Sequence, residues 1–229
     1  MGLIRRHLDY DRKWLLAEAE KARIRGRRRR AISFYRRILA AEPHDPHLHA
    51  RVAPLLAATG KRFDAWQSYH QAAQVHLKNK GREEALALYR EATKTLPMRI
   101  EAWQWVAKLE LGRGRGDCAL NALLEGRARL RSRRYRAEAI ALLREARSIE
   151  PWRIDIVLDL VRLLRRSGQS PEAQWILAQL AEKLDGRDLR IVRGAQWRIE
   201  PSLKNSWNWI RAAFAAQKSG NSRVPARNI

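Results

Sequence analysis

The residue types that most often carry chemistry are scarce in this sequence and poorly placed for it. Histidines cluster between His44 and His49, but Pro46 interrupts the cluster and no clean pair falls on one helical face. We therefore expect no metal site there. Cys118 is the only cysteine, which excludes an internal disulfide and a thiolate metal cluster. No histidine is evident as its partner, so we expect a buried or incidental thiol.

Motifs of catalysis are also missing. The sequence contains no phosphate-binding GxxxxGK[ST] loop, no HExxH pair and no nucleophile elbow. A glycine-rich run alternates with arginine from Gly112 to Gly116, but no strand pattern precedes it, so it reads as a basic loop between helices. We expect no catalytic residues, no metal, no cofactor and no small-molecule substrate. The sequence predicts a protein that is not an enzyme.

The charge of the chain points to a different kind of function. Lysine and arginine number 47 against 24 acidic residues, a formal charge of +23 over 229 residues. An excess of this size indicates an anionic partner. Apolar residues make up 45% of the chain, enough for a folded core, and no apolar run approaches the roughly 20 residues of a membrane span. A secretory signal is not recognisable, so we expect a cytoplasmic location, free or peripheral to a membrane-associated complex.

Helical periodicity fills almost the whole chain. Apolar residues recur at spacings of three and four, glycine or proline separates the segments, and no alternating segment is long enough for a strand. An all-α protein of about 12 helices is predicted, without a sheet. The expected helices cover residues 11–25, 28–42, 46–58, 62–79, 82–96, 100–111, 117–132, 136–149, 153–166, 171–184, 187–199 and 202–217.

The sequence also repeats itself with a period of 54 residues. Residues 44–97 align with residues 98–151 without a gap, and weaker matches extend in both directions. A tandem array of three-helix units is expected, in which each unit buries its apolar face against the next. The expected organisation is an N-terminal arm over 1–10, a solenoid over 11–201, a capping helix over 202–217 and a flexible basic tail over 218–229. The solenoid divides into units over 11–43, 44–97, 98–151 and 152–201.

Small residues recur where helices must turn or cross. Glycines end a helix in each full unit, and an alanine follows five residues later, with a closing proline further on. These positions include Gly60, Gly114, Gly168, Ala31, Ala65, Ala85, Ala119, Ala139, Ala173, Pro43, Pro97 and Pro151. The pattern resembles the tetratricopeptide repeat family over roughly residues 11–200, and the resemblance implies an α-solenoid of stacked antiparallel helices. The extra helix in each unit departs from the family's 34-residue period, which prevents a direct transfer of the family's peptide-groove positions.

Two arginines recur at the full period. Stacked repeats bring equivalent residues into columns, so Arg36, Arg90, Arg144 and Arg198 should form one ladder, which we expect to be structural and paired with glutamates. The second ladder consists of Arg28, Arg82, Arg136 and Arg190. Together with the cationic turns beside it, it should form a basic ridge on one edge of the solenoid, and we expect this ridge to bind the partner. The basic ridge consists of Arg25, Arg28, Arg29, Arg30, Lys78, Lys80, Arg82, Arg131, Arg133, Arg134, Arg136, Arg187 and Arg190.

The nine tryptophans are expected to divide between core and surface. Spacing favours packing roles for Trp14, Trp66, Trp103, Trp175 and Trp197. In the last helix an apolar stripe of Leu203, Trp207, Ile210 and Phe214 should cap the array. Trp209 then points away from that stripe, and together with Arg211 it is a candidate partner contact.

Three functions are compatible with these patterns. The first is a scaffold or linker that binds acidic protein subunits through the basic ridge and assembles a larger complex. The second is RNA or other nucleic-acid binding by the same cations. The third is a peripheral adaptor on an anionic membrane surface, using the ridge and the helix that carries Trp207 and Trp209.

Overall fold

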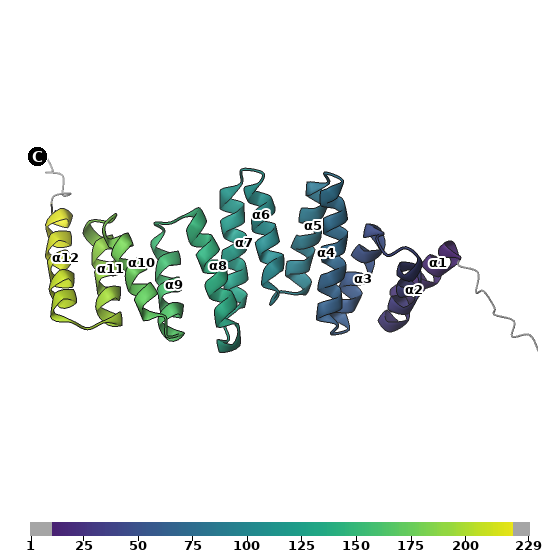
Figure 1. Cartoon of the computed structure of the whole chain (residues 1–229), viewed down its shortest axis with the longest axis horizontal. Helices are drawn as coiled ribbons and strands as arrows, with labels where there is room; N and C mark the ends of the chain where they lie inside the picture. The colour runs from purple at the N-terminus through teal and green to yellow at the C-terminus, as the bar shows by residue number, and fades with distance from the viewer. Residues whose placement is uncertain (1–10, 222–229) are drawn as a thin grey trace, which may run out of the picture. The chain divides into compact units, whose positions relative to one another are not determined.

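The chain folds into helices joined by short turns. The computed structural model describes residues 11–221, so the predicted N-terminal arm and residues 222–229 of the predicted tail lie outside the described residues. Within that range there are twelve α-helices, one short 3-10 turn and no strand (Figure 1). The predicted all-α fold is confirmed. The helices are α1 (Arg12–Ile24), α2 (Arg28–Ala41), α3 (Pro46–Ala58), α4 (Arg62–Lys78), α5 (Arg82–Thr95), α6 (Ile100–Leu111), α7 (Gly116–Arg129), α8 (Arg136–Ile149), α9 (Ile154–Arg166), α10 (Ser170–Ala181), α11 (Gly186–Ile199) and α12 (Leu203–Asn221).

Local sequence signals set several helix boundaries. The Asp45 carboxylate accepts hydrogen bonds from the backbone N–H groups of His47 and Leu48 at 2.9 and 3.2 Å, and Pro46 is the first residue of α3. An aspartate cap followed by proline is a strong start signal because it satisfies otherwise unpaired N–H groups. At the other end of α3, Gly60 adopts a φ of +81° in the turn to α4, a conformation that favours glycine.

The helices group into two compact units, residues 1–114 and 115–229, whose described parts hold α1 to α6 and α7 to α12. In each unit consecutive helices pack as antiparallel neighbours. Ion pairs also join helices that are two apart along the chain, as Arg36 on α2 with Asp64 on α4 and Arg144 on α8 with Glu172 on α10, both at 2.7 Å. Within a unit, the even-numbered helices therefore form one layer and the odd-numbered helices the other.

The core of each unit is built on small residues at the helix crossings. The six alanines predicted for these crossings are 0 or 1% exposed: Ala31, Ala65, Ala85, Ala119, Ala139 and Ala173. Tyr35, Tyr69 and Tyr89 are fully buried beside them. Alanine lets two helix backbones approach closely, and the larger side chains one turn later fill the space that remains.

The tryptophans follow the predicted division only in part. Trp66 and Trp103 are 8 and 5% exposed and pack as expected. The prediction was wrong for Trp14 and Trp175, which are 52 and 58% exposed, and Trp197 is 41% exposed. Helical spacing shows which residues lie on the same face of a helix, but it does not show whether another helix covers each of them.

The orientation predicted for the last helix was also wrong. Trp209 of α12 stacks on Trp197 of α11 with ring centroids 6.3 Å apart, and its indole lies against Gly194. The expected capping stripe faces outward instead, since Leu203 and Trp207 are 91 and 61% exposed. None of the described helices is long and apolar enough to cross a membrane.

Candidate interaction surfaces

The residues of the predicted basic ridge lie at turns and near the ends of helices. Arg136 is partly buried and the others are exposed. They form four groups: the α1–α2 cluster (Arg25, Arg28, Arg29, Arg30), the α4–α5 cluster (Lys78, Lys80, Arg82), the α7–α8 cluster (Arg131, Arg133, Arg134, Arg136) and the α11 cluster (Arg187, Arg190).

Within residues 11–221, no cation of these four clusters forms an ion pair with a carboxylate. Their contacts are of other kinds. Arg30 lies over the Phe34 ring at 5.7 Å, Arg134 lies over the Tyr135 ring at 5.5 Å, and Arg136 donates to the carbonyl of Arg166 at 2.5 Å. Such contacts hold a guanidinium in place without neutralising it, so the clusters present net positive charge to the solvent.

The α1–α2 cluster has the longest unbroken run of cations of the four. Three consecutive arginines, Arg28 to Arg30, form the first turn of α2, and that turn contains no acidic residue. The N-terminal end of a helix carries a partial positive charge, so cations there repel the helix dipole as well as each other. An anionic partner would relieve both repulsions.

The arginine ladder through Arg36 behaves differently. Arg36 and Arg144 pair with acids on the helix two positions further along the chain, and Arg90 pairs with Glu110 on α6. For Arg198, the contact is made by the backbone carbonyl, which accepts a hydrogen bond of 3.0 Å from the guanidinium of Arg165. The expectation that Arg36, Arg90 and Arg144 have structural partners is confirmed. Arg90 and Arg144 pair with glutamates as expected, whereas the partner of Arg36 is an aspartate.

The basic residues do not lie on one edge, as the 54-residue period led us to expect. In unit 115–229 the α7–α8 cluster lies at the lower end of the helices, whereas the turn from α10 to α11 lies at the upper end (Figure 1). A repeat of three antiparallel helices reverses its direction from one copy to the next. Within a unit, equivalent residues therefore lie at opposite ends of the helices, and the same alternation separates the α1–α2 and α4–α5 clusters within unit 1–114.

A further cationic site was missed by the sequence prediction. A groove of about 290 Å³ runs between α9 and α11, with Arg162, Arg165, Arg166 and Arg198 among its lining residues. We call it the α9–α11 groove. The apolar lining residues are Leu158, Val161, Ile191, Ala195 and Ile199. The spacing of the arginines on α9, three and four residues apart, could have indicated a cationic face. The other wall of the groove comes from α11, however, and no local sequence pattern shows that α9 and α11 lie side by side.

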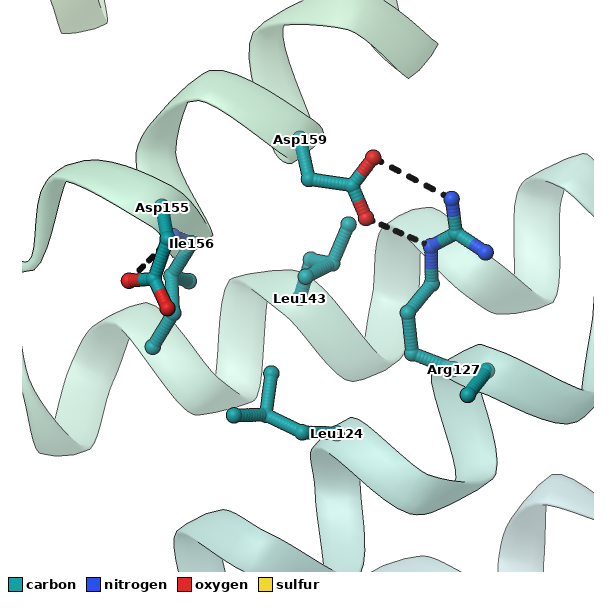
Figure 2. Close-up of a pocket in the computed structure, with 7 residues that line it drawn as sticks. Leu124, Arg127, Leu143, Asp155, Ile156 and Asp159 are labelled. Carbon is teal, nitrogen blue, oxygen red and sulfur yellow. Dashed lines mark hydrogen bonds and ion pairs between the residues drawn. The ribbon is translucent and has the colours of Figure 1, made fainter.

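A second cavity of about 300 Å³ lies among α7, α8 and α9. Figure 2 shows Arg127 turned toward Asp159, with Leu124 and Leu143 between this pair and Asp155. The two Arg127–Asp159 contacts measure 2.9 and 3.2 Å. Asp155 accepts from the Ile156 backbone N–H at 2.9 Å. The charged groups of this cavity already have partners within the protein. In the α9–α11 groove Arg162 likewise pairs with Asp159 at 3.4 Å, but among the described residues Arg165, Arg166 and Arg198 have no carboxylate partner.

Unit 1–114 contains an aromatic cluster on α4, α5 and α6. Tyr89 shares a hydrogen bond of 2.9 Å with Nδ1 of His70, receives one of 3.2 Å from Gln74, and stacks on Trp105 with centroids 5.3 Å apart. Burial raises the pKa of Tyr89 to about 12 and lowers the pKa of His70. His70 is therefore held neutral near neutral pH, and its Nδ1 can accept a hydrogen bond from the Tyr89 hydroxyl.

The histidines and the cysteine considered for metal or thiol chemistry do not come together in one site in the described part of the chain. Among the described residues, no group of three histidine, cysteine, aspartate or glutamate side chains is placed to hold a metal ion. His49 is buried, with Nε2 2.9 Å from the Pro43 carbonyl, and Asp45 caps α3. Cys118 is an exposed free thiol.

Comparison with known proteins agrees with this architecture. The family model of the tetratricopeptide repeat matches residues 136–192, which span α8 to α10 and the first half of α11. The resemblance drawn from the glycine, alanine and proline spacing is thus confirmed, and the chain is a tetratricopeptide-repeat-like helical repeat protein. No curated protein matches the sequence.

Solved structures with similar helix arrangements include tetratricopeptide repeat proteins from two bacteria. The protein of Thermus thermophilus is 16% identical, with 91% of this chain and 93% of that chain covered and a TM-score of 0.33. The protein of Parabacteroides merdae is 16% identical, with 93% of each chain covered and a TM-score of 0.27. A MamA fragment of Desulfovibrio magneticus is 15% identical over 74% of this chain and 93% of that chain, with a TM-score of 0.27. At these TM-scores the three matches add nothing to the fold assignment.

Proposed function

We propose that the protein is a non-enzymatic scaffold that binds acidic protein partners through its basic clusters and helps to assemble a larger complex. One observation supports this proposal above the others. The thirteen cations of the four clusters form no ion pair with a carboxylate within the described residues, whereas Arg36, Arg90 and Arg144 each have an acidic partner. Cations without a carboxylate partner, at turns and near the ends of helices, are available to an external acidic surface.

The positions of the clusters favour bridging. Because the direction of the three-helix repeat alternates, each unit carries basic clusters at both ends of its helices. Two acidic surfaces can therefore contact one unit at opposite ends. This arrangement suits a linker between subunits better than a receptor that encloses a single ligand.

The α9–α11 groove adds an apolar component to the same proposal. Arg165, Arg166 and Arg198 of the groove can pair with carboxylates, and its apolar lining residues can contact aliphatic or aromatic side chains. The occupant that fits both features is an acidic segment of a partner protein with apolar residues among its carboxylates.

The proposal is tested by capture of proteins from the native cells on two variants of equal charge. The triple variant Arg28→Ala, Arg29→Ala, Arg30→Ala removes three unpaired cations. The control Arg36→Ala, Arg51→Ala, Arg144→Ala removes three cations that pair with Asp64, Glu20 and Glu172. Acidic proteins should be lost from the first variant and retained by the second. Loss of all captured material after ribonuclease treatment would instead indicate RNA as the partner.

A further inference from the structure

The last helix presents an apolar stripe that no other described part of its unit covers. Leu203 is 91% exposed, Trp207 61%, Ile210 37% and Phe214 66%. At about 100° per residue these four positions fall within roughly 60° of arc on α12. Single exposed apolar residues are ordinary, but an aligned stripe with two large aromatic rings marks an interaction surface.

The opposite side of α12 explains why the stripe faces outward. Ala212 is 5% exposed and Trp209 stacks on Trp197 of α11. A Cβ atom added at Gly194 would lie 3.2 Å from the Trp209 indole nitrogen, which shows how closely that ring approaches α11. The helix is anchored through this face, so the stripe cannot rotate inward without losing these contacts.

The basic residues around the stripe favour an anionic partner. Residues 201–229 contain five basic residues and no acidic residue. Lys204 and Arg211 lie about 80 to 100° around the helix from Leu203, and both are exposed. A helix with an apolar face, tryptophan and flanking cations has the composition of one that lies in the interface of an anionic bilayer.

We infer that the α12 stripe, formed by Leu203, Trp207, Ile210 and Phe214, docks the protein on an anionic membrane surface. The apolar side chains enter the headgroup boundary, while Lys204 and Arg211 contact lipid phosphates. A second copy of the chain fits less well, because an α12 to α12 contact would place like charges together without any acid from this region. This docking goes beyond the proposed binding of acidic proteins and uses different residues.

Flotation of the full-length protein with vesicles tests the inference. The vesicles contain phosphatidylcholine alone or with about 30% phosphatidylglycerol, at about 150 mM salt, where purely electrostatic contacts are screened. The test variant is Trp207→Ser with Phe214→Ser. The matched control is Trp175→Ser with Phe63→Ser, which removes the same residue types at 58 and 62% exposure on α10 and α4. Circular dichroism checks that both variants remain helical.

The wild type and the control should float with the anionic vesicles and not with the neutral ones. The test variant should float about tenfold less. No flotation of the wild type, or equal flotation of the test variant, would overturn the inference. Wild-type dimers in sedimentation without lipid that become monomers in the test variant would assign the stripe to a second copy. Loss of flotation in the Arg28→Ala, Arg29→Ala, Arg30→Ala variant alone would assign lipid binding to the α1–α2 cluster.

Discussion

The guanidinium of Arg90 on α5 pairs with the carboxylate of Glu110 on α6, whose side chain is fully buried while that of Arg90 is half exposed. Leucines occupy the positions 54 residues before and after Glu110, and both Leu56 and Leu164 are buried. Glu110 thus places a charged group where the repeat otherwise has an apolar one. Its other near cation is Arg113, at 3.9 Å.

The stability of the protein should depend on both members of the Arg90–Glu110 pair. Arg90→Ala should lower the free energy of unfolding by about 3 kcal/mol, because it leaves a buried carboxylate without its main partner. Adding Glu110→Leu to this variant should restore most of the loss, since leucine suits the site in the neighbouring repeats. Urea denaturation of the full chain measures both effects. The control Arg36→Ala, which breaks an exposed pair, should cost less than about 1 kcal/mol; equal losses from the two arginine variants would contradict this account.

The burial of His70 beside Tyr89 should make the stability of unit 1–114 depend on pH. Burial lowers the pKa of His70 in the folded state, so the unfolded chain binds a proton more readily. Stability should therefore fall as pH decreases from about 6.5 through the lowered pKa of the folded state. Urea midpoints at pH 7 and pH 5 should differ less in His70→Gln than in the wild type. The exposed-site control His44→Gln should keep the wild-type difference, and an unchanged difference in His70→Gln would remove His70 as the cause.

The turn between α3 and α4 requires glycine. Gly60 has a φ of +81° and nothing lies within 4 Å of an added Cβ atom, so any cost of Gly60→Ala comes from the backbone. The substitution should lower the free energy of unfolding by about 1 kcal/mol. Gly116 begins α7 without a positive φ and also has open space around it. Gly116→Ala should leave stability unchanged or raise it, and thermal melts that show equal losses at both sites would refute the backbone explanation.

The orientation of α12 predicts different effects for its two tryptophans. Trp209 stacks on Trp197, whereas Trp207 is 61% exposed on the outer face. Trp209→Ala should lower the free energy of unfolding by about 1 to 2 kcal/mol, and Trp207→Ala should change it by less than about 0.5 kcal/mol. Thermal denaturation compares the two variants. The opposite ranking would mean that the stripe, and not Trp209, packs against α11.

The helices and their crossings could be predicted because both depend on local patterns. Periodic apolar residues, the aspartate cap before Pro46 and the glycine at position 60 each determine structure within a few residues of themselves. The crossing alanines were found from spacing alone, since close approach of two helices tolerates few other residues. All six are buried.

The surfaces were harder to predict because they depend on which helix covers which face. Trp175 and Trp207 have helical core spacing, yet each lies more than half exposed. The basic clusters lie near turns, but within a unit they do not share one edge, because a repeat of three antiparallel helices reverses its direction from one copy to the next. The α9–α11 groove combines residues from two helices separated by α10, a pairing that no short sequence pattern records.

Binding of acidic proteins by the unpaired cations is tested most directly by capture from native cell extract on the two variants of equal charge. The variant Arg28→Ala, Arg29→Ala, Arg30→Ala should lose acidic proteins that the wild type captures at about 50 mM salt and releases at higher salt. The variant Arg36→Ala, Arg51→Ala, Arg144→Ala should capture them as the wild type does. Equal capture by both variants and the wild type would contradict the central claim.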